Sequence, residues 1–145
     1  MLALAIAGCG GGADDAPVRA LMQRYLHAMI TQDWSGACAL LTPEAAELRH
    51  RSAPSADCAG ALAFEAGGGL SNPPPYVHPE RAGEEFRDVR VQKIDLRGDE
   101  SAQVHVASPN GEAFILLAVR REGRWLLAQD LEVGIPIDRF STPSP

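Results

Sequence analysis

The chain has 145 residues, which suits one domain and is too short for two of ordinary size. Hydrophobic residues make up 46% and charged residues 22%, a composition typical of globular proteins and not of disordered or fibrous ones. The 13 basic and 19 acidic residues give a net charge of −6, which argues against a nucleic-acid partner because binding to phosphates depends on basic side chains. No stretch reaches the roughly 18 apolar residues of a membrane-spanning helix.

The N-terminus has the features of an export signal. Residues 1–8 read MLALAIAG, and Cys9 follows directly before three glycines. The run from Ile6 to Cys9 resembles a bacterial lipobox, in which small residues precede the cysteine that receives diacylglycerol. This resemblance implies a signal-peptide remnant over residues 1–8, then the lipidated Cys9 and a flexible tether over residues 9–14, and a cell-envelope protein anchored on the outer face of the cytoplasmic membrane. Signal peptides begin with basic residues, but none precedes Arg19, so the alternative is the apolar N-terminus of a cytosolic protein.

The cysteine count is consistent with an oxidising compartment. The chain has 3 cysteines, and lipid on Cys9 leaves Cys38 and Cys58 to form a disulfide. That bond would close a loop of about 20 residues and stabilise two short alanine-rich helices by about 3 kcal/mol. The alternative is two free cysteines that pack as small hydrophobic groups. Neither belongs to a Cys-x-x-Cys motif or to a Cys/His pair with metal-ligand spacing, so no metal site and no cofactor is expected.

A long amphipathic helix is predicted to begin at Asp14 or Asp15, either of which suits the cap position, and to end near Gln32. Pro17 suits its first turn. Its apolar residues recur at intervals of three and four, as they do on one face of an α-helix. These residues are Val18, Leu21, Met22, Tyr25, Leu26, Met29 and Ile30.

Shorter helices are predicted after it, over residues 33–41, 42–50 and 55–66. Each begins at a residue type that caps helices, and these residues are Asp33, Thr42 and Ser55. The three glycines that follow residue 66 end the last helix, and the proline-rich stretch up to Pro79 is predicted to be a loop.

The last third of the chain predicts an antiparallel sheet of about four strands. Alternating apolar residues over 89–96 and 102–106 indicate two strands, with a bulge at Gln92-Lys93 where the alternation changes phase. Residues 113–119 are apolar on both faces, which is typical of a central strand, and a last strand is expected over 125–133. Turns are expected at residues 98–99, 109–111 and 122–123, and residues 136–145 are expected to be a flexible tail.

The order of elements, helices first and then a meander of strands, predicts an α+β fold. This order, with the sequences of Val18–Leu41, Gly98–Val104 and Arg121–Leu127, resembles the nuclear transport factor 2-like superfamily, whose cone-shaped fold curls a sheet around the first helix. The resemblance covers residues 15–133, and one domain is predicted over residues 15–135. With the lipobox and the two later cysteines, the chain is similar to small exported lipoproteins of this superfamily, of the actinobacterial type. Members often dimerise through the sheet, so a homodimer is left open.

The resemblance implies a pocket between the first helix and the curved sheet. Tyr25 and Met29 from the helix, and Trp125, Leu127 and Gln129 from the last strand, are the candidates to line it. The alternative is that these side chains form an ordinary core, because methionine and aromatic residues at helical spacing most often pack together.

Enzymes of this superfamily place an acidic base or an Asp/His pair inside the cone. Asp130 is the acid that best suits such a role, because it interrupts an apolar strand, and His105 is the candidate histidine. Alternation along the strands nevertheless places both side chains on the outer face of the sheet. No Gly-x-Ser-x-Gly motif and no phosphate-binding glycine loop accompanies them.

The function predicted from the sequence is therefore binding without catalysis. The chain is expected to be a lipid-anchored envelope protein that binds either a small apolar ligand in the cone or an envelope protein on the open face of the sheet. A large apolar patch on the outer sheet face would indicate a protein partner. The alternative function is that of a cone-fold isomerase, cyclase or hydratase that uses Asp130, His105 or both.

Overall fold

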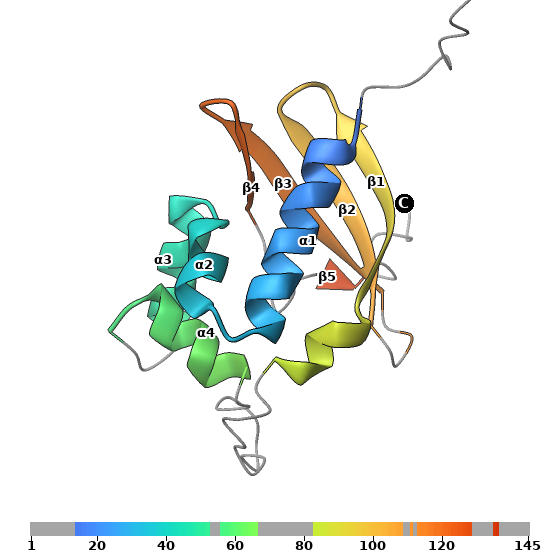
Figure 1. The fold of residues 1–145 in the computed structure, drawn as a ribbon. Helices are drawn as coiled ribbons and strands as arrows, with labels where there is room; N and C mark the ends of the chain where they lie inside the picture. The colour runs from blue at the N-terminus through green and yellow to red at the C-terminus, as the bar shows by residue number, and fades with distance from the viewer. Residues whose placement is uncertain are drawn as a thin grey trace, which may run out of the picture.

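The computed structural model describes residues 14–52, 56–66, 83–108, 111, 113–128 and 135–136. It has the predicted α+β fold, in which the helices precede a curved antiparallel sheet (Figure 1). The helices are α1 (Ala16–Ile30), α2 (Trp34–Ala39), α3 (Pro43–Ser52), α4 (Cys58–Ala66) and the short 3-10 helix η2 (Glu84–Asp88). The strands are β1 (Arg90–Arg97), β2 (Ser101–Ala107), β3 (Ala113–Arg121), β4 (Arg124–Leu127) and β5 (Ile135–Pro136). None of the described helices is long and apolar enough to cross a membrane.

α1 lies against one face of the sheet and buries the predicted apolar stripe (Figure 1). Asp14 Oδ1 accepts a hydrogen bond of 2.9 Å from the backbone N–H of Ala16, and Pro17 occupies the first turn, so the helix begins where the sequence predicts. The buried residues of α1 are Val18, Leu21, Met22, Tyr25, Ala28 and Met29. Ala28 extends the predicted stripe, whereas Leu26 and Ile30 lie at its edges and are half-buried.

A polar side chain directly before the first turn caps each of the three shorter helices. Asp33 accepts a hydrogen bond of 3.0 Å from a backbone N–H of α2, and Thr42 accepts one of 3.2 Å from α3, which confirms both predicted caps. The cap of α4 is Asp57, which accepts a backbone N–H at 2.8 Å. The predicted cap, Ser55, lies outside the described residues, and α4 begins too late in the chain for Ser55 to take that position.

The sheet is an antiparallel meander in the order β1-β2-β3-β4. The predicted bulge is confirmed, since the register of β1 against β2 shifts between Val91 and Lys93. β3 is the predicted central strand and pairs with β2, β4 and the two-residue β5, which the sequence did not predict. β4 ends at Leu127, and residues 129–133 of the expected last strand lie outside the described part of the chain.

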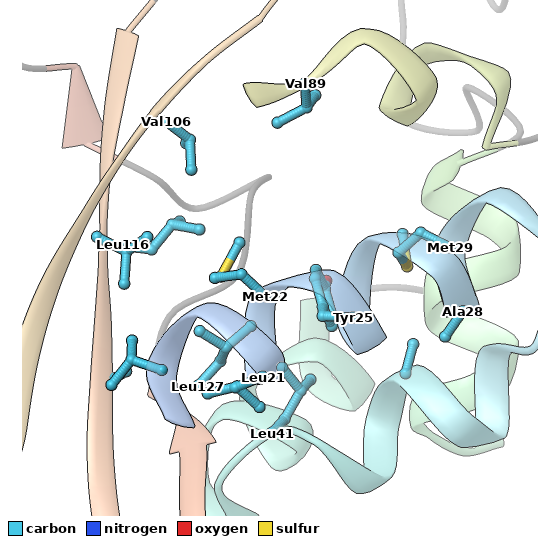
Figure 2. Close-up of a cluster of buried hydrophobic side chains, with 14 of the residues drawn as sticks. Leu21, Met22, Tyr25, Ala28, Met29, Leu41, Val89, Val106, Leu116 and Leu127 are labelled. Atoms are coloured by element: carbon cyan, nitrogen blue, oxygen red, sulfur yellow. The ribbon is translucent and has the colours of Figure 1, made fainter. Parts of the chain in front are cut away.

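The core lies between α1 and the inner face of the sheet (Figure 2). β2 contributes Ala102, Val104 and Val106, all fully buried, and β3 contributes Leu116 and Ala118. Side chains alternate across a strand, so every second residue of β2 faces α1. Apolar packing between helix and sheet is thus what holds the two layers together.

The segment that joins α2 to α3 runs along the free edge of β4. The Leu127 N–H donates to the Leu40 carbonyl oxygen at 2.8 Å, and the Thr42 N–H donates to the Leu127 carbonyl oxygen at 2.8 Å. A parallel bridge forms between Leu41 and Leu127. These bonds cover the edge of β4 and attach the helical layer to the sheet.

A glycine allows η2 to pack against the end of α1. Gly83 precedes η2 with a φ of 88°, in the left-handed region that favours glycine. A Cβ atom at this position would overlap the carbonyl oxygen of Met29 in α1. Close approach of two backbones and a positive φ therefore both require glycine here.

Candidate functional site

Two adjoining hollows surround Trp125 at the end of the molecule where α1 begins. We name the larger one, of about 400 Å³, the Trp125 groove; it is lined by Pro17, Ala20, Arg24, Ala39, Leu40 and residues 123–126. The smaller hollow, of about 230 Å³, is lined by Asp14, Pro17, Leu96, Gly98, Asp99, Arg120, Gly123 and Trp125. The Trp125 groove falls within the range of about 300–1,000 Å³ that is usual for small-molecule sites.

The β3–β4 hairpin places Trp125 at this end of the sheet. Glu122 and Gly123 form its turn with φ angles of 52° and 77°, which is the two-residue geometry that tight hairpins favour. Trp125 shares a face of the sheet with Leu127. Leu127 is fully buried but Trp125 only partly, because Trp125 lies nearer the hairpin turn, beside the first turn of α1, where the helical cover ends.

The two hollows differ in charge. The charged residues that line the Trp125 groove are Arg24 and Arg124, both exposed, and none of the described acidic residues lines it. Within the described part of the chain, neither arginine forms an ion pair. The smaller hollow instead combines Asp14 and Asp99 with Arg120. An anion is therefore attracted to the groove and meets like charge in its neighbour.

A neighbouring arginine, Arg121, has an acidic partner among the described residues. Arg121 Nη1 lies 2.6 Å from Glu44 Oε2 on α3. The pKa of Glu44 is lowered chiefly by a hydrogen bond from its own backbone N–H at the start of α3, and then by the hydrogen bond from Arg121. Glu44 is thus committed to Arg121, and Arg124 on the facing strand keeps its charge available.

Most of the predicted pocket residues belong to the core. Tyr25, Met29 and Leu127 are at most 1% exposed and pack inside the hydrophobic cluster, as the alternative interpretation holds (Figure 2). They line neither of the two hollows, whereas Trp125 lines both. Gln129 lies outside the described residues. The two hollows therefore lie at the end of the helix–sheet interface.

The outer face of the sheet holds the candidate histidine. His105 lies on the other face of β2 from the buried residues of that strand, which confirms its predicted outward direction. Its Nε2 lies 2.9 Å from Asp95 Oδ2, and Lys93 Nζ lies 3.0 Å from Asp95 Oδ1. The pKa of Asp95 is lowered chiefly by the hydrogen bond from Lys93, against partial burial, which raises it, with His105 adding to the lowering. Asp130, the other candidate, lies outside the described residues.

Exposed apolar surface does not mark this outer face. Among the described residues, Leu48 is the large hydrophobic side chain that is exposed, at 56%, and it lies on α3. The apolar residues of β3 that face outward, such as Ile115 and Leu117, are half-buried. The apolar patch that would indicate a protein partner is therefore not found on the described part of the sheet.

A disulfide and a buried ion pair fasten α4. Cys38 of α2 is bonded to Cys58 of α4, with Cα atoms 6.2 Å apart, which confirms the predicted pairing. The guanidinium of Arg49 on α3 pairs with the carboxylate of Glu65 on α4, and both residues are buried. The sequence analysis did not find this pair, although Glu65 interrupts an apolar helix and shares a face with Ala61 and Leu62. Cys9 lies outside the described residues.

No group of three or more histidine, cysteine, aspartate or glutamate side chains is arranged to hold a metal ion within the described ranges. Comparison of the chain with protein-family models, with curated proteins and with solved structures finds no match. The site is therefore interpreted from its own geometry: a half-buried indole, small apolar side chains and two arginines that form no ion pair with the described residues.

Proposed function

We propose that this protein is a binding domain without catalytic activity, held on the outer face of the cytoplasmic membrane by lipid on Cys9. The observation that carries the proposal is the disulfide between Cys38 and Cys58. Disulfides form and persist in oxidising compartments outside the cytoplasm and are rare inside it. The bond thus supports the export that the lipobox resemblance implies, and it removes two of the 3 cysteines from other roles.

The position of the two hollows supports a binding role beside the membrane. Asp14 lines the smaller hollow and is five residues after Cys9 in the chain. Five extended residues span at most about 18 Å. A lipid on Cys9 would therefore hold the Trp125 groove close to the bilayer surface, at high local concentration relative to membrane-associated ligands.

The arrangement of ionisable groups supports binding over the cone-enzyme alternative. General acid–base catalysis needs titratable groups that converge on one pocket in environments that shift their pKa values apart. His105 is instead hydrogen-bonded to Asp95 on the outer face of the sheet, away from α1 and from both hollows. The groove offers an apolar wall and fixed positive charge, which suit recognition.

The proposal is tested by labelling with lipid and by alkylation of free thiols. The chain is expressed from the furthest upstream in-frame start in a bacterium that processes lipoproteins, with radioactive palmitate in the medium. We expect label in the wild-type chain and none in Cys9→Ser, while Cys38 and Cys58 resist alkylation until a reductant is added. An unlabelled wild-type chain that fractionates like Cys9→Ser, with all thiols open to alkylation, would show that the protein is neither anchored nor exported.

A further inference from the structure

We propose that the Trp125 groove binds one molecule of an anionic amphiphile, with its apolar chain on the groove floor and its acidic group between Arg24 and Arg124. This inference rests on the binding role proposed above but not on the lipid anchor. Fatty-acid carboxylates are the ligand class that this combination of surfaces fits. The groove lies outside the helix–sheet interface, in the space between α1, the end of α2 and β4.

The floor of the groove is apolar, and the groove exists because small apolar side chains leave space beside larger ones. Ala20 of α1 and Ala39 of α2 are exposed and line the groove together with the half-buried Trp125 and Leu40. An acyl chain placed here removes apolar surface on both sides from water, at about 25 cal/mol per Å². The volume of about 400 Å³ sets a limit, so the groove takes one short chain and not a multi-chain lipid.

The charges at the rim select the head group. Arg24 and Arg124 bring two positive charges to the groove, and the described residues supply no carboxylate to neutralise them. This is unusual in a chain whose net charge is −6. A guanidinium presents paired N–H donors that match the two oxygens of a carboxylate. Two guanidinium groups that have no carboxylate partner among the described residues suit an anionic ligand.

The smaller hollow disfavours the opposite orientation of the ligand. Its two carboxylates, Asp14 and Asp99, outnumber its one guanidinium, Arg120, so an acidic head group is attracted less to that side of Trp125 than to the groove. The head group therefore stays at Arg24 and Arg124, and the apolar chain extends over Ala20 and Ala39. Like-charge repulsion next to an attractive site is a common source of specificity.

The binding test uses Trp125 as its own reporter. The full chain carries Cys9→Ser to prevent lipidation, and Trp34→Phe to leave Trp125 as its single tryptophan. The probes are decanoate, decanol and decyltrimethylammonium, which share one chain and differ in charge. We expect decanoate to change the Trp125 emission with saturation, decanol to bind at least about tenfold more weakly, and the cation not to bind. Calorimetry with the same probes on the chain that keeps Trp34 covers the case in which Trp34→Phe does not fold.

Two sets of variants, each with its control, locate the site. Arg24→Gln and Arg124→Gln are each expected to weaken decanoate binding about tenfold and to leave decanol unchanged, whereas Arg87→Gln on η2, which is exposed and outside the groove, has no effect. Ala20→Leu fills the groove and is expected to abolish binding of both probes. Its matched control is Ala16→Leu, on the exposed side of the same helix and outside the groove. Circular dichroism confirms that each variant is folded.

The outcomes separate this inference from the proposed function. Decanoate affinity that survives Ala20→Leu and both arginine variants overturns the groove site but keeps a binding role elsewhere on the domain. The absence of binding by any of the three probes overturns the groove site and leaves the palmitate and thiol results to decide the rest. Binding to phosphatidylglycerol vesicles without binding of monomeric decanoate also overturns it, because the contact is then with a membrane surface and not with one captured molecule.

Discussion

Reduction of the disulfide should lower the free energy of unfolding by an amount that follows from the length of the loop the bond closes. The bond between Cys38 and Cys58 closes a loop of 20 residues, which contains α3 and joins α2 to α4. In the chain-entropy model a loop of this length stabilises the folded state by about 3 kcal/mol, because the unfolded chain loses freedom when it is crosslinked. The free energy of unfolding should fall by about this amount on reduction.

The assay is urea unfolding of the Cys9→Ser chain, oxidised and reduced, followed by circular dichroism. With an m-value of about 2 kcal/mol/M, the midpoint should fall by about 1.5 M on reduction. Hydrogen exchange should show the largest loss of protection in α4, which packs mainly on α2 and α3 and lies away from the sheet. A Cys38→Ala/Cys58→Ala variant should resemble the reduced chain and be insensitive to reductant.

The reasoning is refuted if the oxidised and reduced chains unfold at the same urea concentration. It is also refuted if the alanine variant is destabilised while reduction has no effect, because the loss then comes from packing and not from the crosslink. A midpoint shift with uniform loss of protection, and none concentrated in α4, would show that α4 is held by other contacts.

Three further predictions concern backbone strain, titration and buried charge. Gly83→Ala should destabilise the fold by at least about 2 kcal/mol in urea unfolding, because the added Cβ overlaps a backbone oxygen and the residue also has a positive φ. In the control Gly98→Ala, φ is 70° but no atom lies near the added Cβ, so the free energy of unfolding should fall by only about 1 kcal/mol. The pKa of Asp95 is lowered in the folded state, so its carboxylate stabilises the fold at a pH above the ordinary pKa of about 4, and this stabilisation is lost as the pH falls through the pKa of the folded state. Asp95→Asn should therefore flatten the decline in thermal midpoint between neutral and acidic pH. An unchanged slope would contradict this. Glu65→Ala should cost about 3–5 kcal/mol of stability, because it removes the carboxylate that the buried Arg49 guanidinium contacts. The double change Arg49→Met/Glu65→Leu should recover most of that loss, and no recovery would mean that the charges themselves are needed.

The elements that repeat a simple period were predictable from the sequence. The three-and-four spacing of α1 and the two-residue alternation of β2 each report which side of the element is buried, and burial alone determines that pattern. The bulge near Gln92 was visible for the same reason, because it changes the phase of the alternation. The two-residue β5 is too short to have a period. The membership of the nuclear transport factor 2-like superfamily stays a prediction.

The site was predictable only in part. Periodicity shows which face of a strand a residue lies on, but not how far along the strand the helix packed on that face extends. Trp125 and Leu127 have the same alternation, and the sequence assigned both to a pocket. One is core and the other lines a groove, because α1 begins at Ala16 and leaves the hairpin turn uncovered. The Arg49–Glu65 pair was hidden for a related reason. Its members lie on two short helices whose relative placement depends on tertiary packing.

The crosslink and the groove act on different properties of the domain. Cys38 directly precedes Ala39 and Leu40, which form one wall of the groove. That wall has its own attachment, because Leu40 and Thr42 are each joined to Leu127 by a backbone hydrogen bond of 2.8 Å. These bonds lie on the sheet side of α2, whereas the disulfide lies on the α4 side. Reduction should therefore lower the free energy of unfolding while the affinity of the folded domain for decanoate stays unchanged, since the sheet and not the disulfide positions the groove.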